Sequence, residues 1–149
     1  MQIALFPLQS LSFMAAAVNQ VEAAAKMITV IVVPLKALLA DLIRRLAEKK
    51  IPYSVWLPSP TWTEAGNTRC LLVTVDHCTD KKIFTYLSLK VQQKQLARIV
   101  LDEIHFILIS DHYRPAFTFL KQLRQLPVPI VGLILFLEEH TWFWSIDYL

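Results

Sequence analysis

Two adjacent carboxylates follow an apolar run in the second half of the chain, and they are the residues best suited to do chemistry. Residues 98–105 read RIVLDEIH, so an apolar strand leads directly into Asp102 and Glu103, and His105 follows. Acids at the end of a buried strand lie where open α/β sheets bind ligands. Asp102 is placed to bind Mg²⁺ through water, and Glu103 to polarise a water for attack on a phosphate. His105 either couples such a site to a neighbouring strand or is a half-buried, hydrogen-bonded histidine.

The composition limits the kind of phosphate site that the chain can build. The 149 residues suffice for one domain with a sizeable core, and 55% of them are hydrophobic. Only two residues, Gly66 and Gly132, are glycine. Phosphate-cradling loops need glycine, because backbone N–H groups must approach the anion closely. Neither G-x-x-x-x-G-K-[ST] nor G-x-G-x-x-G occurs, so a self-sufficient nucleotide loop is absent from this sequence.

The charge of the chain leaves nucleic acid open as a partner, and its cysteines argue against disulfides and a zinc site. The net charge of +3 is compatible with nucleic acid without requiring it. Cys70 and Cys78 are too few for a disulfide framework or a zinc site, so we expect reduced thiols. His77 precedes Cys78, but strand neighbours point to opposite faces, so we do not expect a catalytic pair.

The mean hydropathy of +0.45 raises the question of a membrane span. Residues 1–21 carry no charge, but polar residues and Pro7 interrupt them, and the apolar segment 126–137 has only 12 residues. A spanning helix needs about 20 apolar residues. We therefore expect no membrane association, and we expect segment 126–137 to contain a buried strand.

Apolar runs and amphipathic segments alternate along the chain. Helices are expected at 11–26, 36–50, 80–90 with Asp80 as N-cap, and 115–126. Strands are expected at 28–33, 53–57, 71–75, 98–101 and 129–136, with a loop at 58–68. The aromatic tail, 138–149, has no clear period. This alternation predicts an α/β fold, a parallel sheet covered by helices.

Several basic and aromatic residues have two interpretations each. The cations of 36–50 either contact phosphates or form a solvated face of mixed charge, in which Asp41 and Arg45 pair at i,i+4. Tyr113 and Arg114 either stack on and pair with nucleic acid or, for Arg114, bond locally near a helix start. The tail aromatics fit a core or a partner-docking surface better than base stacking.

Four stretches, taken together, carry a family resemblance. They are IVVPLKALLADLIRRL at 31–46, LLVTVDH at 71–77, RIVLDEIHFIL at 98–108 and YRPAFTFLKQLRQLPVPIVGL at 113–133. They resemble motif Ia, motif Ib, motif II and the segment leading to motif III of the first RecA-like domain of superfamily 2 DNA helicases, within it the RecQ-like group of fungi. The resemblance covers residues 28–137, leaving a divergent segment 1–27 and the tail 138–149.

The resemblance implies an ATP-dependent 3′–5′ DNA helicase of the nucleus, with ATP and Mg²⁺ as cofactors and DNA as partner. It implies catalytic roles for Asp102, Glu103 and His105, with the Mg²⁺ held by Asp102 through water. It also implies a nucleic-acid surface that contains Pro34, Lys36, Thr74, Asp76, Tyr113 and Arg114.

The chain departs from the family pattern at several places. The P-loop of motif I and the glutamine motif are missing from residues 1–27, and Ile134, Leu135 and Phe136 stand where motif III has Thr-Ala-Thr. The Trp-Gly of the aromatic-rich loop and the second motor domain with its arginine finger are also missing. We therefore expect an incomplete RecA-like (P-loop NTPase) domain, a fragment unable to hydrolyse ATP alone.

Loss of the P-loop strand has a structural consequence. That strand normally lies beside the motif III strand, so we expect an open apolar sheet edge there, which residues 2–8 would cover only imperfectly because of Pro7. The alternative function is therefore a non-enzymatic interaction module that binds a protein partner through this edge and the aromatic tail.

Overall fold

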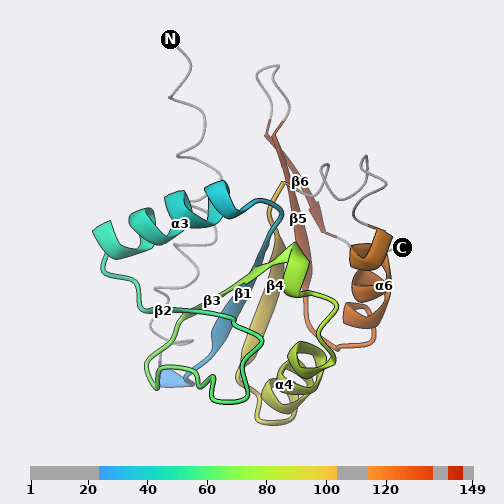
Figure 1. Ribbon diagram of the computed structural model, residues 1–149, viewed down its shortest axis with the longest axis horizontal. Helices are drawn as coiled ribbons and strands as arrows, with labels where there is room; N and C mark the ends of the chain where they lie inside the picture. Colours follow the sequence, from blue (N-terminus) through green and yellow to red (C-terminus); the bar gives the residue numbers. More distant parts are fainter. Residues whose placement is uncertain (1–23, 104–113, 136–140, 146–149) are drawn as a thin grey trace.

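The computed structural model describes residues 24–103, 114–135 and 141–145, and its centre is a six-stranded sheet (Figure 1). The strands are β1 (Ile28–Val33), β2 (Tyr53–Val55), β3 (Cys70–Thr74), β4 (Leu96–Leu101), β5 (Ile130–Leu135) and β6 (Thr141–Ser145). The helices are α3 (Lys36–Glu48), α4 (Lys81–Gln92) and α6 (Arg114–Leu123), with a short 3₁₀ turn, η1 (Val75–His77).

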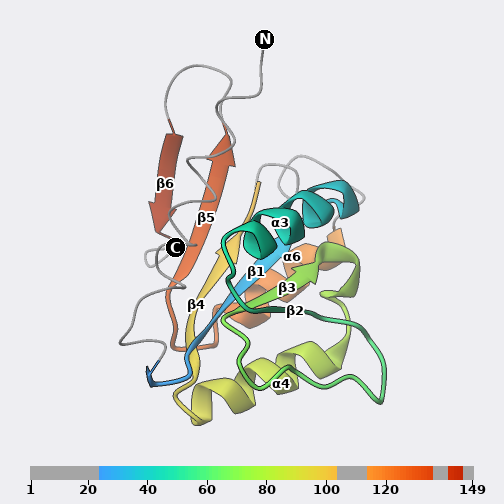
Figure 2. The same cartoon turned by 90° about the vertical axis from the view of Figure 1, so that its left-hand side faces the viewer.

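The strand order is β2-β3-β1-β4-β5-β6. The first five strands are all parallel, and β6 runs antiparallel to β5. Figure 2 shows β5 and β6 side by side. The predicted α/β fold with a parallel sheet is therefore confirmed, and the antiparallel strand at one edge is an addition to it.

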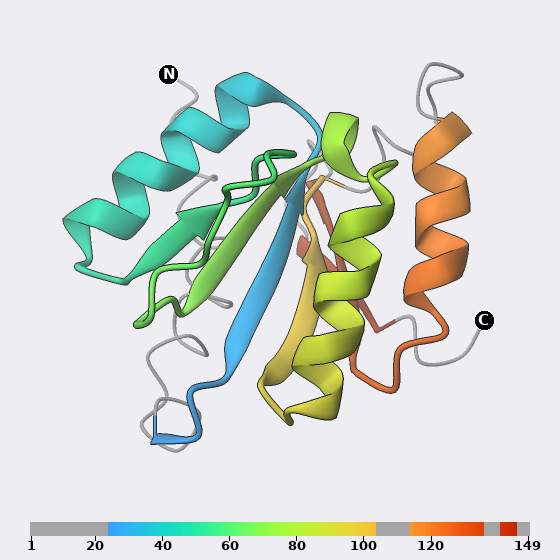
Figure 3. The same cartoon turned by 60° about the horizontal axis from the view of Figure 1, so that its bottom comes forward.

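Helices cover both faces of the sheet (Figure 3). Alternate residues of β1 point to opposite sides, so that Val30 and Val32 pack with α4 and α6, whereas Ile31 and Val33 pack with α3. Strands covered on both faces are nearly continuous apolar runs, which is why β1 reads ITVIVV, with Thr29 as its polar residue, and is buried along its whole length.

The crossovers explain why the helices lie on opposite faces. From β1 the chain passes through α3 to β2, toward one end of the strand order. From β3 it passes through α4 to β4, and from β4 through α6 to β5, toward the other end of the strand order. Crossovers between parallel strands are right-handed, so a reversal of direction places the connecting helix on the opposite face. The sheet is therefore doubly wound about β1.

Helix ends follow local chemistry. Asp80 caps α4 as predicted, because its side chain accepts a hydrogen bond of 3.0 Å from the backbone N–H of Lys82. Beyond the end of α4, the N–H groups of Lys94 and Gln95 donate to the carbonyls of Val91 and Lys90, which is a Schellman motif. The end of α3 repeats this arrangement at Lys50 and Ile51.

Several predicted strand boundaries differ from those in the structure. β4 begins at Leu96 rather than at residue 98, and β3 ends at Thr74, after which the chain turns into η1. The aromatic tail, whose sequence has no clear period, contains β6. The predicted helix 11–26 lies almost wholly outside the described residues. Among the described helices, none is both long and apolar enough to cross a membrane.

Candidate functional site

The carboxyl ends of β3, β1 and β4 meet at one edge of the sheet, here called the carboxyl edge. Val33 is the register partner of Thr74 on one side, and on the other the backbone N–H of Asp102 donates to the carbonyl of Val32 over 2.9 Å. The chain leaves β1 toward one face of the sheet and leaves β3 and β4 toward the other. This is the switch point at which open α/β sheets bind ligands.

Asp102 and Glu103 follow the last residue of β4, as predicted, but their environments differ. Asp102 is partly exposed, whereas Glu103 is buried with 5% of its surface accessible. Glu103 also has a φ of +49°, the left-handed conformation that non-glycine residues adopt only at some cost. The backbone therefore turns sharply immediately after β4, and only Asp102 is accessible for a hydrated metal ion.

Pro34 and Lys36 lie where β1 passes into α3. Pro34 is buried, and Lys36, the first residue of the helix, is exposed. The N-cap residue, Leu35, has no side-chain oxygen that could accept from the first N–H groups of α3. The amino end of α3 therefore presents both a lysine and backbone donors beside the carboxyl edge, and such ends attract phosphate.

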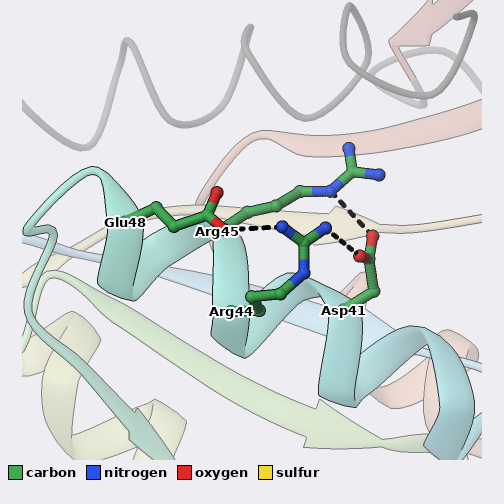
Figure 4. Close-up of polar contacts among 4 residues, drawn as sticks. All are labelled: Asp41, Arg44, Arg45 and Glu48. Carbon is green, nitrogen blue, oxygen red and sulfur yellow. Dashed lines mark hydrogen bonds and ion pairs between the residues drawn. The ribbon is translucent and has the colours of Figure 1, made fainter.

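The two arginines of α3, Arg44 and Arg45, form ion pairs with acidic residues of the same helix, as Figure 4 shows. Arg44 forms ion pairs of 2.6 Å with both Asp41 and Glu48, and Arg45 pairs with Asp41 at 2.7 Å. The hydrogen bond from Arg44, with the charge of Arg45, holds the pKa of Asp41 below its usual value. This network favours the interpretation of a mixed-charge face for Arg44 and Arg45 and leaves Lys36 as the better phosphate ligand.

The motif Ib-like segment ends at the same edge. Thr74 is buried, and its hydroxyl lies 3.2 Å from Nδ1 of His77, whereas Asp76 is exposed on η1. Cys78 is buried, and its Sγ lies 3.6 Å from the carbonyl of Thr74, to which the thiol donates. Burial raises the pKa of the Cys78 thiol far above its ordinary value, so the thiol is protonated and a poor nucleophile.

Cys70 has the same inert character. It is fully buried in β3 facing α3, and burial raises the pKa of its thiol to about 12. Both cysteines are free, as predicted. They fill space in the core as small apolar side chains.

Part of the predicted site lies outside the described residues, namely His105 and Tyr113. Arg114 begins α6, and only its backbone is described. Within the described ranges, no group of three or more His, Cys, Asp or Glu side chains is arranged to hold a metal ion.

The sequence did not reveal a polar cluster built from the predicted loop and α4. Glu64 accepts a hydrogen bond from the Tyr86 hydroxyl and forms an ion pair of 2.6 Å with Lys90. Beside this cluster, the rings of Trp56 and Trp62 have centroids 4.5 Å apart, and both lie 5.5 Å from Tyr86. The sequence offered one signal for this packing, namely Trp56 just before the predicted loop 58–68 and Trp62 within it, because large aromatic side chains are usually buried.

Comparison with known proteins adds no assignment: the chain matches no protein-family model and no curated protein sequence. The geometry therefore defines the class of the chain only as a doubly wound α/β domain with an acidic pair at its switch point.

Proposed function

We propose that this chain is an incomplete RecA-like motor lobe of the RecQ-like helicase type, which binds nucleic acid weakly at its carboxyl edge and does not hydrolyse ATP alone. One observation carries the proposal. The segments similar to motifs Ia, Ib and II lie on the adjacent strands β1, β3 and β4, and all three end at the carboxyl edge. Lys36, Thr74 and Asp102 therefore come from three segments to one edge.

The chemistry of that edge supports phosphate binding better than phosphate cleavage. Lys36 and the amino end of α3 supply charge and donors for a nucleic-acid backbone. Asp102 is accessible for a hydrated Mg²⁺, whereas Glu103 is buried, and the sequence contains no glycine-rich loop with a lysine to hold the β- and γ-phosphates. Binding of ATP and Mg²⁺, and a nuclear location, are implied by the resemblance alone and stay predictions.

The first test measures DNA binding by fluorescence anisotropy with a labelled single strand at several salt concentrations. We expect affinity that falls steeply with salt, because phosphate contacts release counterions. Lys36→Glu should weaken binding and reduce the magnitude of the salt slope by about 1, the contribution of one phosphate contact.

Lys49→Glu is the matched control for this test. It makes the same charge change in an exposed lysine at the other end of α3, so it should leave the slope nearly unchanged. Equal losses in the two variants, or binding that does not respond to salt, would contradict a site at the carboxyl edge.

The second test measures ATP turnover. The purified chain should release phosphate at the background rate with or without DNA, and Glu103→Gln should behave identically, because no loop brings a phosphate to the acids. DNA-stimulated turnover that Glu103→Gln abolishes would show that the chain is an active ATPase.

The alternative of an interaction module loses one of its two surfaces. The prediction of an open edge at the motif III-like strand is wrong for β5, because β6 pairs with it over Thr141–Ser145. Whether residues 2–8 approach this edge lies outside the described residues. Binding of a protein partner through the remaining edges or the aromatic tail stays a prediction.

A further inference from the structure

A second polar site lies at the amino ends of the parallel strands, whereas Asp102 lies at their carboxyl ends. A pocket of about 590 Å³ is lined by residues that precede three strands: Lys26 before β1, Arg69 before β3 and Gln95 before β4. Gly66, Asn67 and Thr68 from the long loop, with Glu64 and Lys90, complete its wall. A pocket of this volume is within the usual size range of small-molecule sites.

The charges that line the pocket are unbalanced. Among the described residues of the lining, Lys26, Arg69 and Lys90 carry positive charge and Glu64 carries negative charge, which gives these residues a net charge of +2. Asn67 and Gln95 add amide groups, which can donate further hydrogen bonds. An anion is therefore the ligand that the pocket favours electrostatically.

Lys90 is held in position before any ligand arrives. Its ammonium lies 2.6 Å from Oε2 of Glu64, donates to Oε1 of Gln95 over 3.2 Å and sits 5.5 Å from the ring centroid of Tyr86. Its side chain is only 14% exposed. An ammonium has three N–H donors, and two serve these oxygens, so one remains for a ligand.

Arg69 and Lys26 complete the cationic lining. Nη1 of Arg69 donates to the carbonyl of Met27 over 2.8 Å, which fixes the guanidinium beside the start of β1. Lys26 is exposed, and its left-handed backbone, with a φ of +53°, turns the chain just before β1. A guanidinium held as that of Arg69 is loses little conformational entropy when it binds an anion.

We propose that this pocket binds a small phosphorylated ligand, with the phosphate at Lys26, Arg69 and Lys90. Arg and Lys are the residues that recognise phosphate, and the net charge and surplus donors match a multivalent anion. The volume exceeds what a lone phosphate would fill, so the ligand carries a further polar body against Asn67 and Gln95. This site is independent of the carboxyl edge and of the helicase hypothesis.

Isothermal titration calorimetry of the full chain with inorganic pyrophosphate tests the proposal. Lys26→Glu should weaken binding at least about tenfold, because it brings the net charge of the lining to zero. Asn67→Asp changes the charge with almost no change of shape and should weaken binding in the same direction. Lys50→Glu is the matched control, since Lys50 is also exposed and left-handed but does not line the pocket.

The outcomes separate this site from the other one and from a polynucleotide surface. Pyrophosphate binding that Lys26→Glu and Asn67→Asp weaken, and that Lys50→Glu leaves intact, supports the proposal, whereas binding that only Lys36→Glu weakens lies at the carboxyl edge and overturns it. Absence of pyrophosphate binding, or equal affinity in all variants, overturns it. DNA binding that Lys26→Glu abolishes, without any pyrophosphate binding, also overturns it in favour of a backbone-phosphate surface. Circular dichroism of each variant checks the fold, and Asn67→Asp serves if Lys26→Glu unfolds.

Discussion

Left-handed residues other than glycine mark the points where this chain turns most sharply. Among the described residues, Lys26, Lys50, Lys94 and Glu103 have φ between +49° and +56°. The first precedes β1, the next two follow helices, and Glu103 follows β4. A residue with a Cβ pays about 1 kcal/mol or more for this conformation, so a glycine-poor chain stores strain at these positions.

The strain at Lys94 can be measured by substitution. Lys94 occupies the position after the C-cap of α4, where glycine is usual, and its N–H donates to Val91 over 2.9 Å. Lys94→Gly keeps this bond and removes the Cβ clash, so we expect the free energy of unfolding to rise by about 0.5–1 kcal/mol. Urea unfolding followed by tryptophan fluorescence gives the value.

Lys94→Ala is the control for this prediction, because alanine removes the long side chain but keeps the Cβ. It should give no comparable gain. If the alanine variant is as stable as the glycine variant, the charge or length of the lysine, rather than its backbone, is the source of the strain.

At the scale of elements, hydrophobic pattern and capping chemistry predicted most of the sheet and its helices. β1 and α3 were found in the sequence because a strand buried on two faces is continuously apolar, and a helix on one face has an apolar stripe. Asp80 indicated the start of α4 because an aspartate side chain can accept from an N–H of the first helical turn. These signals are local, so they can be read without the fold.

The features that could not be predicted from the sequence depend on contacts between residues far apart in the chain. The loop residue Glu64 meets Tyr86 of α4, 22 positions away, and nothing near either residue indicates this contact. The pocket at Lys26, Arg69 and Lys90 likewise forms only when three strands start at one edge. By contrast, Asp102 and Glu103 were predictable because their position depends only on the strand directly before them.

At the scale of the whole molecule, β6 decides how the sheet ends. β5 reads IVGLIL, with no charge or proline, and such a strand exposes a row of backbone groups that pairs readily with another chain. All five residues of β6 pair with β5, from Ser145 with Val131 to Thr141 with Leu135. β5 is therefore an interior strand, paired with β4 on one side and with β6 on the other, and β6 is the edge strand of the sheet.

A truncation tests whether β6 protects β5. A chain that ends at residue 140 lacks β6, so we expect a lower melting temperature and self-association that increases with concentration, both because the uncovered apolar edge seeks a partner. A chain that ends at Ser145 keeps β6 and is the matched control. Sedimentation velocity at several concentrations, with thermal unfolding of both chains, gives the comparison. If the shorter chain has the same sedimentation coefficient and melting temperature as the control, β6 does not protect β5, and another part of the chain must shield it.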